Sequence, residues 1–270
     1  MFRQASLVII TLIFICSGVS AAEQKFPGRN TFPDVPVYEL DELFRNFEHV
    51  VIVDARSHYE FETLRIKNAV NIALGTKSFD DQLQKLRAST DKPIVFYCNG
   101  RTCYKSYEAV RQANFLKVEN TYAFDAGVVE WARSHPQLAV LLGKSPIKPQ
   151  DLISKEMFQS HLLAPKTFSD KVDSSSTIVL DVRDRFQREA IGFFPGNEHW
   201  VNLDKKEQIH RYIEKAKREN KTLLIYDAVG KQVIWLQYTL EQAGFKNYYF
   251  MENGAQGFYK FLAGQQWDKK

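Results

Sequence analysis

Residues 50–56 read VVIVDAR, a run of mostly β-branched apolar residues that ends in an acidic and a basic residue. A closely similar run, TIVLDVR, occupies residues 177–183. Short, continuous apolar runs of this kind predict strands that are buried on both faces of a sheet. We therefore expect a buried strand ending in Asp-x-Arg at two places in the chain.

Three further pairs of segments follow in the same order, and all four pairs are offset by 127 to 131 residues. Such ordered repetition indicates two copies of one structural unit. In a chain of 270 residues, two units of ordinary domain size account for nearly the whole sequence. The further pairs are 69–72 with 200–203, 93–98 with 222–227, and 122–127 with 249–254.

Amphipathic patterns lie between the predicted strands. In residues 204–216, Ile209, Ile213 and Ala216 share one helical face and the charged residues occupy the other. Short apolar strands that alternate with such helices predict an α/β fold around a mainly parallel sheet with helices on both faces. Similar helical patterns occur at 106–113, 128–134 and 232–243, and two prolines and a glycine at 143–150 predict the linker between the units.

The first 22 residues have the pattern of a secretory signal peptide: Arg3, an apolar stretch at 7–15 and small residues up to Ala22. The alternative is an uncleaved membrane anchor, because residues 4–22 carry no charge. A cleaved signal predicts a periplasmic or secreted protein. The net charge of +4 is mild and the charges are mixed along the chain, which argues against a nucleic-acid partner.

Of the three cysteines, Cys98 and Cys103 would remain after cleavage. Cys98 ends the apolar run 93–98 and precedes a short polar loop that leads into a predicted helix. Backbone N–H groups that converge before a helix N-terminus stabilise a thiolate, so this is a favourable place for a reactive thiol. A buried, unreactive cysteine at a strand end is the alternative.

Taken in order, these motifs resemble the tandem rhodanese-like proteins. The resemblance implies two rhodanese-like domains, at 33–145 and 151–268, with a linker at 146–150; each would hold a mainly parallel five-stranded sheet flanked by helices on both faces. It implies a sulfurtransferase in which Cys98 takes up sulfane sulfur as a persulfide, without cofactor or metal. The residues that carry the resemblance are Asp54, Arg56, Glu60-Phe61, 69–72, Cys98, Ser106, Ala109, Gly127 and Trp131.

The resemblance also implies roles within the loop. Its amides would hold the persulfide, and the cations Arg101 and Lys105 would attract a small anionic sulfur donor. Ser106 is expected to cap the following helix. The span from Cys98 to Gly127 is two residues longer than its counterpart in the second copy, so the donor type, thiosulfate or mercaptopyruvate, stays open. The expected substrate-binding residues are Asn99, Gly100, Arg101, Thr102 and Lys105.

Two positions divide the copies. Asp227 stands where the second copy would need its cysteine, so that copy is expected to be catalytically silent and to support the first. Cys103 has three readings: a resolving thiol for Cys98, a passive loop residue, or a partner in binding a soft metal such as copper(I). The pairs Asp54–Arg56 and Asp181–Arg183 occur in both copies, so we expect structural ion pairs rather than catalysts.

The leading hypothesis is therefore an exported sulfurtransferase that passes sulfur from Cys98 to a thiol or another small nucleophile. One alternative is a thiol-disulfide redox protein that uses Cys98 and Cys103 as a pair. Another is a non-enzymatic rhodanese-like binding module. A membrane partner is expected only if the signal segment stays uncleaved.

Overall fold

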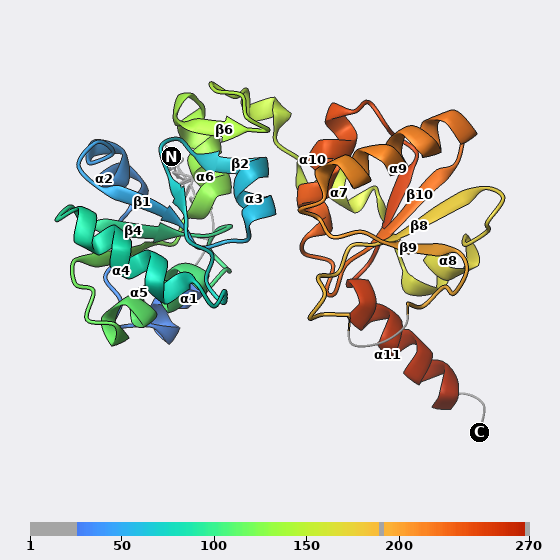
Figure 1. Ribbon diagram of the computed structural model, residues 1–270, viewed down its shortest axis with the longest axis horizontal. Coiled ribbons are helices and arrows are strands. Elements are labelled where there is room, and N and C mark those ends of the chain that lie inside the picture. The colour runs from blue at the N-terminus through green and yellow to red at the C-terminus, as the bar shows by residue number, and fades with distance from the viewer. Residues whose placement is uncertain (1–25, 189–191, 268–270) are drawn as a thin grey trace, which may run out of the picture.

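A computed structural model describes residues 26–188 and 192–267 of the chain. It shows two α/β units joined by one connecting segment (Figure 1). The predicted signal peptide, residues 1–22, lies outside the described residues. Within the described ranges, no helix combines the length and the apolar content needed to cross a membrane.

The first unit is built on a parallel sheet with the order β3-β1-β4-β5. A fifth strand was expected here, but that position holds only an isolated bridge from Val37 to Ala123. The carbonyl of Pro36 accepts a hydrogen bond from Ala123 N–H at 2.9 Å, and Tyr38 N–H donates to the carbonyl of Ala123 at 2.8 Å. Pro36 itself has no N–H to donate, so the ladder of hydrogen bonds stops there. The strands are β1 (Val51–Asp54), β3 (Val70–Asn71), β4 (Ile94–Tyr97) and β5 (Thr121–Phe124).

Helices cover both faces of this sheet because its central strand β4 is apolar on both sides. Ile94 and Phe96 pack in one cluster with residues of α4 and α5, and Val95 and Tyr97 pack in another with residues of α2 and α6. A short antiparallel pair, β2 with β6, adds to the second side. The elements are α1 (Pro27–Thr31), α2 (Leu40–Arg45), α3 (His58–Thr63), β2 (Leu64–Ile66), α4 (Phe79–Ser89), α5 (Lys105–Phe115), α6 (Gly127–Ser134), a 3₁₀ turn at Pro136–Leu138 and β6 (Ala139–Leu141).

The second unit has a five-stranded parallel sheet with the order β7-β11-β10-β8-β9. Residues of α9 and α10 pack on one face, and those of α8 and α11 on the other. The two units thus share one architecture, as the sequence repeat predicted. The elements are a 3₁₀ turn at Pro149–Asp151, α7 (Lys155–Gln159), β7 (Leu162–Leu163), α8 (Pro165–Asp170), β8 (Thr177–Asp181), β9 (Glu198–Trp200), α9 (Lys206–Glu219), β10 (Thr222–Tyr226), α10 (Val233–Gln242), β11 (Tyr248–Met251) and α11 (Gly254–Trp267).

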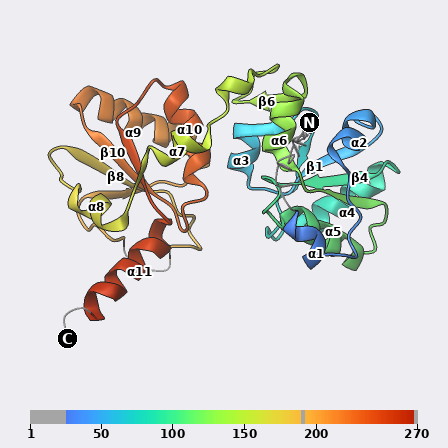
Figure 2. The same cartoon turned by 180° about the vertical axis from the view of Figure 1, so that it is seen from behind.

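The two units meet where α3 of the first faces α10 of the second (Figures 1 and 2). The hydroxyls of Tyr59 and Thr239 are 3.2 Å apart across this contact. Lys206 forms an ion pair with Glu62 at 3.4 Å. One apolar cluster includes buried residues of both units, among them Trp131 and Trp235. The units therefore share part of their core.

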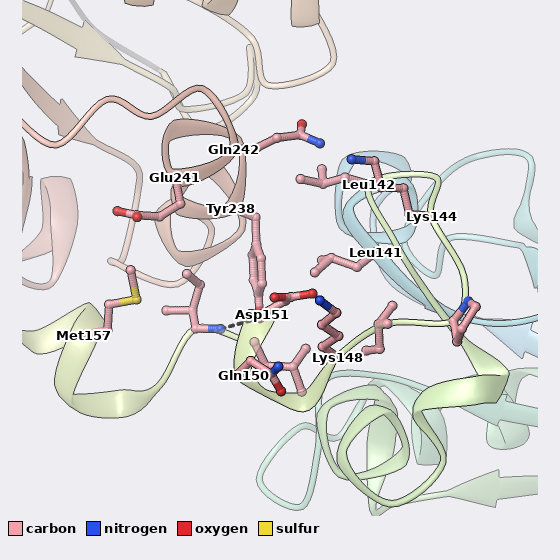
Figure 3. A pocket seen from close by; sticks show the side chains of 14 residues that line it. Leu141, Leu142, Lys144, Lys148, Gln150, Asp151, Met157, Tyr238, Glu241 and Gln242 are labelled. Atoms are coloured by element: carbon pink, nitrogen blue, oxygen red, sulfur yellow. Dashed lines mark hydrogen bonds between the residues drawn. The ribbon is translucent and has the colours of Figure 1, made fainter.

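The linker at 146–150 and the residues just after it pack in the apolar cluster that the two units share. Ile147, Leu152 and Ile153 are buried, and Ile153 N–H donates to the hydroxyl of Tyr238 on α10 at 3.1 Å. A cavity of about 490 Å³ lies between the linker and α10, with Leu141 on its opposite wall (Figure 3). None of the site residues expected from the sequence lines this cavity.

Candidate active site

Cys98 lies at the carboxyl end of β4, where the strand passes into a loop of seven residues, 98–104, before α5. The side chain of Cys98 is fully buried. The first N–H groups of a helix have no partners inside the helix and carry partial positive charge. The N-terminus of α5, which attracts anions, therefore directly follows the last residue of the cysteine loop.

Cys98 and Cys103 are joined by a disulfide, and their Cα atoms are 6.3 Å apart. A turn folds the loop back on itself, since the N–H of Cys103 donates to the carbonyl of Gly100 at 2.8 Å. Cys103 is partly exposed, in contrast to Cys98. The structure thus brings together the two cysteines that the sequence singled out. In this disulfide form neither sulfur is a thiolate that could bind a soft metal.

Gly127, the first residue of α6, supports the loop from behind. Its φ is +70°, and a Cβ at this position would collide with the backbone of Asn99 and Gly100. The N–H of the next residue, Val128, donates to the carbonyl of Cys98 at 2.9 Å. A glycine is required here because the backbone is left-handed and the loop lies against it.

Ser106 does not cap α5, which corrects the expectation from the sequence. The helix begins at Lys105, and its N-cap position is Tyr104, which makes no side-chain cap. Tyr104 has near-helical dihedral angles, so the helical turn starts before Ser106. The buried Ser106 hydroxyl instead lies 3.9 Å from the sulfur of Cys98. It is therefore a polar group that faces the sulfur of Cys98.

Arg101 also differs from its expected role. Its guanidinium donates to both oxygens of Glu130 on α6, at 2.9 and 2.7 Å, and lies 4.3 Å from the ring centre of Phe26. The hydrogen bond with Glu130 raises the pKa of Arg101. Arg101 therefore points away from the cavity of about 410 Å³ that lies beside the cysteine loop; it is not among the residues that line this cavity. A carboxylate within reach on the neighbouring helix accounts for this orientation.

The cavity beside the cysteine loop has a volume of about 410 Å³ and lies between the two units. Its walls come from the cysteine loop and from the corresponding loop of the second unit. Of the expected substrate-binding residues, Asn99, Thr102 and Lys105 line it, and Gly100 and Arg101 do not. Cys103 lines it, whereas the buried Cys98 does not. The remaining lining residues are Glu60, Tyr104, Glu108, Gln187, Asp227, Ala228, Val229, Lys231 and Gln232.

Asn99, the residue after Cys98, is held from two sides. Its amide oxygen accepts from Arg56 at 3.1 Å, and its amide nitrogen donates to Glu60 at 3.1 Å. Burial opposes ionisation of Glu60, but the charges of Arg56 and Lys105 and the hydrogen bonds from Asn99 and Ser57 outweigh it and lower the pKa of this carboxyl. The role of Glu60 was not recognised in the sequence. The signal available there was its position four residues after Arg56.

The two Asp-x-Arg pairs form buried ion pairs at the ends of β1 and β8. Arg56 contacts Asp54 at 2.6 Å, and Arg183 contacts Asp181 at 2.8 Å. Burial by itself lowers the pKa of Arg56, but the negative charge of Asp54 and its hydrogen bonds to the guanidinium outweigh this effect, so the pKa is raised. Arg56 also donates to the carbonyl of Leu64 at 2.5 Å, so it ties the strand end to β2 as well as to the cysteine loop.

Asp227 occupies the position of Cys98 in the second unit. Its buried carboxylate accepts hydrogen bonds from four backbone N–H groups of its own loop and of the start of α10. The strand-loop-helix unit therefore forms a cradle for a negatively charged group at this position. The four donors are Val229, Gly230, Gln232 and Val233.

The extra length of the first loop is smaller than the sequence indicated. Seven residues, 98–104, separate β4 from α5, against six, 227–232, between β10 and α10. The second extra residue is absorbed by α5, which has 11 residues against 10 in α10. The two-residue difference is therefore shared equally between the loop and the helix. Among the described residues, no group of three or more His, Cys, Asp and Glu side chains is arranged to hold a metal ion.

Fold and site together define a class: a protein of two parallel α/β domains with a cysteine loop on one and a carboxylate in the matching loop of the other. The chain belongs to the rhodanese-like domain family, which matches residues 37–134 and 164–261. Membership of this family supports a function of the sulfurtransferase type.

Comparison with curated proteins finds the tRNA uridine(34) hydroxylase of Erwinia tasmaniensis, 39% identical over 88 residues. The match covers 31% of this chain and 24% of that protein, so the chain spans about a quarter of the length of the curated relatives it matches. Similar solved structures include the thiosulfate sulfurtransferase of Pseudomonas aeruginosa, with 16% identity and a TM-score of 0.36 over 86% of this chain and 46% of that one. A rhodanese-related protein of Thermoplasma volcanium covers 37% of this chain and 93% of its own, at 20% identity and a TM-score of 0.30.

Proposed function

We propose that the protein is a sulfurtransferase in which the reduced Cys98 accepts sulfane sulfur and passes it to a thiophilic acceptor. The observation that carries this proposal is the cradle around Asp227. In the second unit, the carboxyl group at the position equivalent to Cys98 accepts hydrogen bonds from four backbone N–H groups. The corresponding strand-loop-helix unit of the first domain, whose loop is one residue longer, would stabilise a Cys98 thiolate and the persulfide formed from it.

The reaction has two steps. With thiosulfate as donor, the Cys98 thiolate attacks the outer sulfur, a sulfur–sulfur bond forms, and sulfite leaves with the electron pair of the broken bond. In the second step a thiolate or another small nucleophile attacks the terminal sulfur of the persulfide and returns Cys98 as a thiolate. No cofactor enters either step.

Two lysines support an anionic donor. Lys105 at the start of α5 and Lys231 in the loop of the second unit both line the cavity of about 410 Å³. The carboxylates of Glu60, Glu108 and Asp227 line the same cavity, so the two lysines would orient an anionic donor by direct contact rather than through a positive field over the whole cavity. The second unit, which has no cysteine in its loop, thus supplies a wall of the site.

The test is intact mass after the reduced full-length protein is incubated with thiosulfate or with 3-mercaptopyruvate. We expect an adduct of one sulfur atom on the wild type and on Cys103→Ser, and none on Cys98→Ser. An adduct that persists in Cys98→Ser would place the nucleophile elsewhere. The donor that gives the faster adduct assigns the donor type.

The disulfide between Cys98 and Cys103 favours a second function, thiol-disulfide exchange with the two cysteines as a pair. The same mass measurement separates the two functions. A protein that cycles between dithiol and disulfide and never gains a sulfur atom from either donor is a redox protein rather than a sulfurtransferase.

Export forms part of the proposal and is supported by the pattern of residues 1–22. We expect the protein to be periplasmic or secreted, with an N-terminus at Ala22 or Glu23. N-terminal sequencing of the protein recovered from the cells that produce it tests this, and a product that retains Arg3 in the membrane fraction would contradict it.

A further inference from the structure

We infer that Cys103 resolves the Cys98 persulfide, so that the protein can reduce sulfane sulfur to hydrogen sulfide and is reset by a dithiol reductant. This inference rests on the proposed persulfide chemistry and adds a second fate for the bound sulfur. It is carried by two features of the cysteine loop, the atom that Cys103 reaches and the unequal burial of the two cysteines, and by the anion cradle at the corresponding position of the second unit.

Cys103 reaches the sulfur of Cys98 itself. The two residues are bonded through these atoms, their Cα atoms are 6.3 Å apart, and the Gly100–Cys103 turn returns the chain to this position. In a persulfide, the Cys98 sulfur is the inner of the two sulfur atoms. A thiolate that attacks the inner sulfur forms the Cys98–Cys103 disulfide and expels the outer sulfur as hydrosulfide. The persulfide sulfur gains two electrons and the two cysteines lose them, so atoms and charge balance.

The unequal burial decides how the disulfide is opened. Cys98 is fully buried, whereas Cys103 is partly exposed and lines the cavity of about 410 Å³. A thiolate that enters this cavity therefore meets the sulfur of Cys103 first. Its attack leaves a mixed disulfide on Cys103 and releases Cys98 as a thiolate.

The cradle favours that direction. Disulfide exchange is faster when the leaving thiolate is stabilised. The corresponding position in the second unit holds the carboxylate of Asp227 on four N–H groups, and Ser106 places a hydroxyl 3.9 Å from the Cys98 sulfur. A dithiol is the suitable reductant, because its second thiol closes on the mixed disulfide and frees Cys103. The partner is thus a dithiol small molecule or a protein with a redox-active cysteine pair.

The experiment follows sulfide release from the reduced full-length protein after one equivalent of inorganic tetrasulfide, with no other thiol present. We expect the wild type to gain one sulfur, release one equivalent of sulfide, and finish as the intramolecular disulfide. Cys103→Ser and Cys103→Ala should keep the added sulfur, with release slowed about tenfold or more. Cys98→Ser is the matched control and should neither gain sulfur nor release sulfide.

Two results would overturn the inference while leaving the proposed function intact. The wild type could hold the added sulfur as stably as Cys103→Ser, or both could release sulfide at the same rate. If no adduct forms on the wild type or on Cys103→Ser, the proposed function itself fails.

A second measurement tests the side of attack. The oxidised wild type is treated with glutathione, quenched with iodoacetamide and mapped by peptide mass spectrometry. The expected product carries glutathione on Cys103 and the alkyl group on Cys98. The opposite pattern would contradict the assignment of Cys103 as the accessible sulfur.

Discussion

At the residue scale, the side chain of Asn99 links the cysteine loop to the buried ion pair of β1. Its side-chain amide accepts a hydrogen bond from Arg56 and donates one to Glu60. The second unit keeps the arginine as Arg183 but has Ala228 and Gln187 at the positions of Asn99 and Glu60. This hydrogen-bonded link therefore exists in the unit that has the cysteine, which indicates that it positions the cysteine loop rather than supporting the shared fold.

Asn99→Ala should slow the loading of sulfur onto Cys98 about tenfold, because the residue that follows the nucleophile loses both of its side-chain anchors. Stability should fall by about 1–2 kcal/mol, since Arg56 and Glu60 each lose one hydrogen bond. The measurement is the rate of the one-sulfur mass adduct. Asn46→Ala is the control. It removes an asparagine whose side chain donates a hydrogen bond to the carbonyl of Glu42 at the end of α2, and it should leave the loading rate unchanged. Equal rates for Asn99→Ala and wild type would refute the role.

Glu60 provides a prediction about pH. Its folded-state pKa is lowered from the reference of 4.5. The unfolded chain therefore binds the proton more tightly than the folded protein does. The stabilisation by Glu60 is fully present above pH 4.5 and is lost as the pH falls through the lower folded-state pKa. Glu60→Gln should reduce the loss of stability below pH 4.5, which urea unfolding at several pH values measures. A variant with the same acid sensitivity as the wild type would contradict this.

At the element scale, the junction of β5 and α6 supports the loop between β4 and α5. Two consecutive strand-to-helix junctions meet here, because the carboxyl ends of neighbouring parallel strands lie at one edge of the sheet. The second unit repeats the arrangement: Gly254 has a φ of +55°, and a Cβ there would collide with Asp227 and its loop. The glycine thus belongs to the fold of both copies.

Gly127→Ala should destabilise the protein by about 2–3 kcal/mol, because a left-handed conformation and a collision with backbone act together. Gly75→Ala is the matched control. Gly75 also has a positive φ, +87°, but nothing lies within 4 Å of its added Cβ, so it should cost about 1 kcal/mol. Urea unfolding compares the two variants. Equal losses would show that the loop moves away freely from residue 127.

At the scale of the whole molecule, α10 of the second unit contacts the buried arginine of the first. The ring of Trp235 lies 5.0 Å from the guanidinium carbon of Arg56 and is itself buried. The second unit therefore packs against the same ion pair that holds Asn99 in the first unit. This explains why a second unit without a cysteine still contributes to the site.

Trp235→Ala should cost about 3–5 kcal/mol of unfolding free energy, because it leaves a cavity in a core shared by both units. It should also slow sulfur loading, since Arg56 loses the ring that packs against it. Phe115→Ala, at a position with 80% of the side chain exposed, should change stability by about 0.5 kcal/mol or less. Urea unfolding and the mass assay test both effects. A Trp235→Ala variant as stable as Phe115→Ala would show that the units do not share their core.

Much of the fold was predictable because it depends on local pattern. The apolar runs around Val53 and Leu180 were predicted as buried strands and form β1 and β8, and the helices expected at 204–216 and 232–243 lie at Lys206–Glu219 and Val233–Gln242. The repeat predicted five strands in each sheet, but the first sheet has four. Pro36 lacks an N–H donor at the edge where the second unit has its fifth strand, β7.

The sequence by itself determined the class of fold, the repetition of one unit, and the different groups, Cys98 and Asp227, at equivalent positions. These depend on periodicity and residue type. Only the tertiary structure decided that Arg101 pairs with Glu130, that Ser106 faces the sulfur, and that both loops line one cavity. The physical reason is that a charged or polar side chain takes the partner within its reach. That partner is fixed by how α6, α5 and the two units pack, which no local pattern encodes.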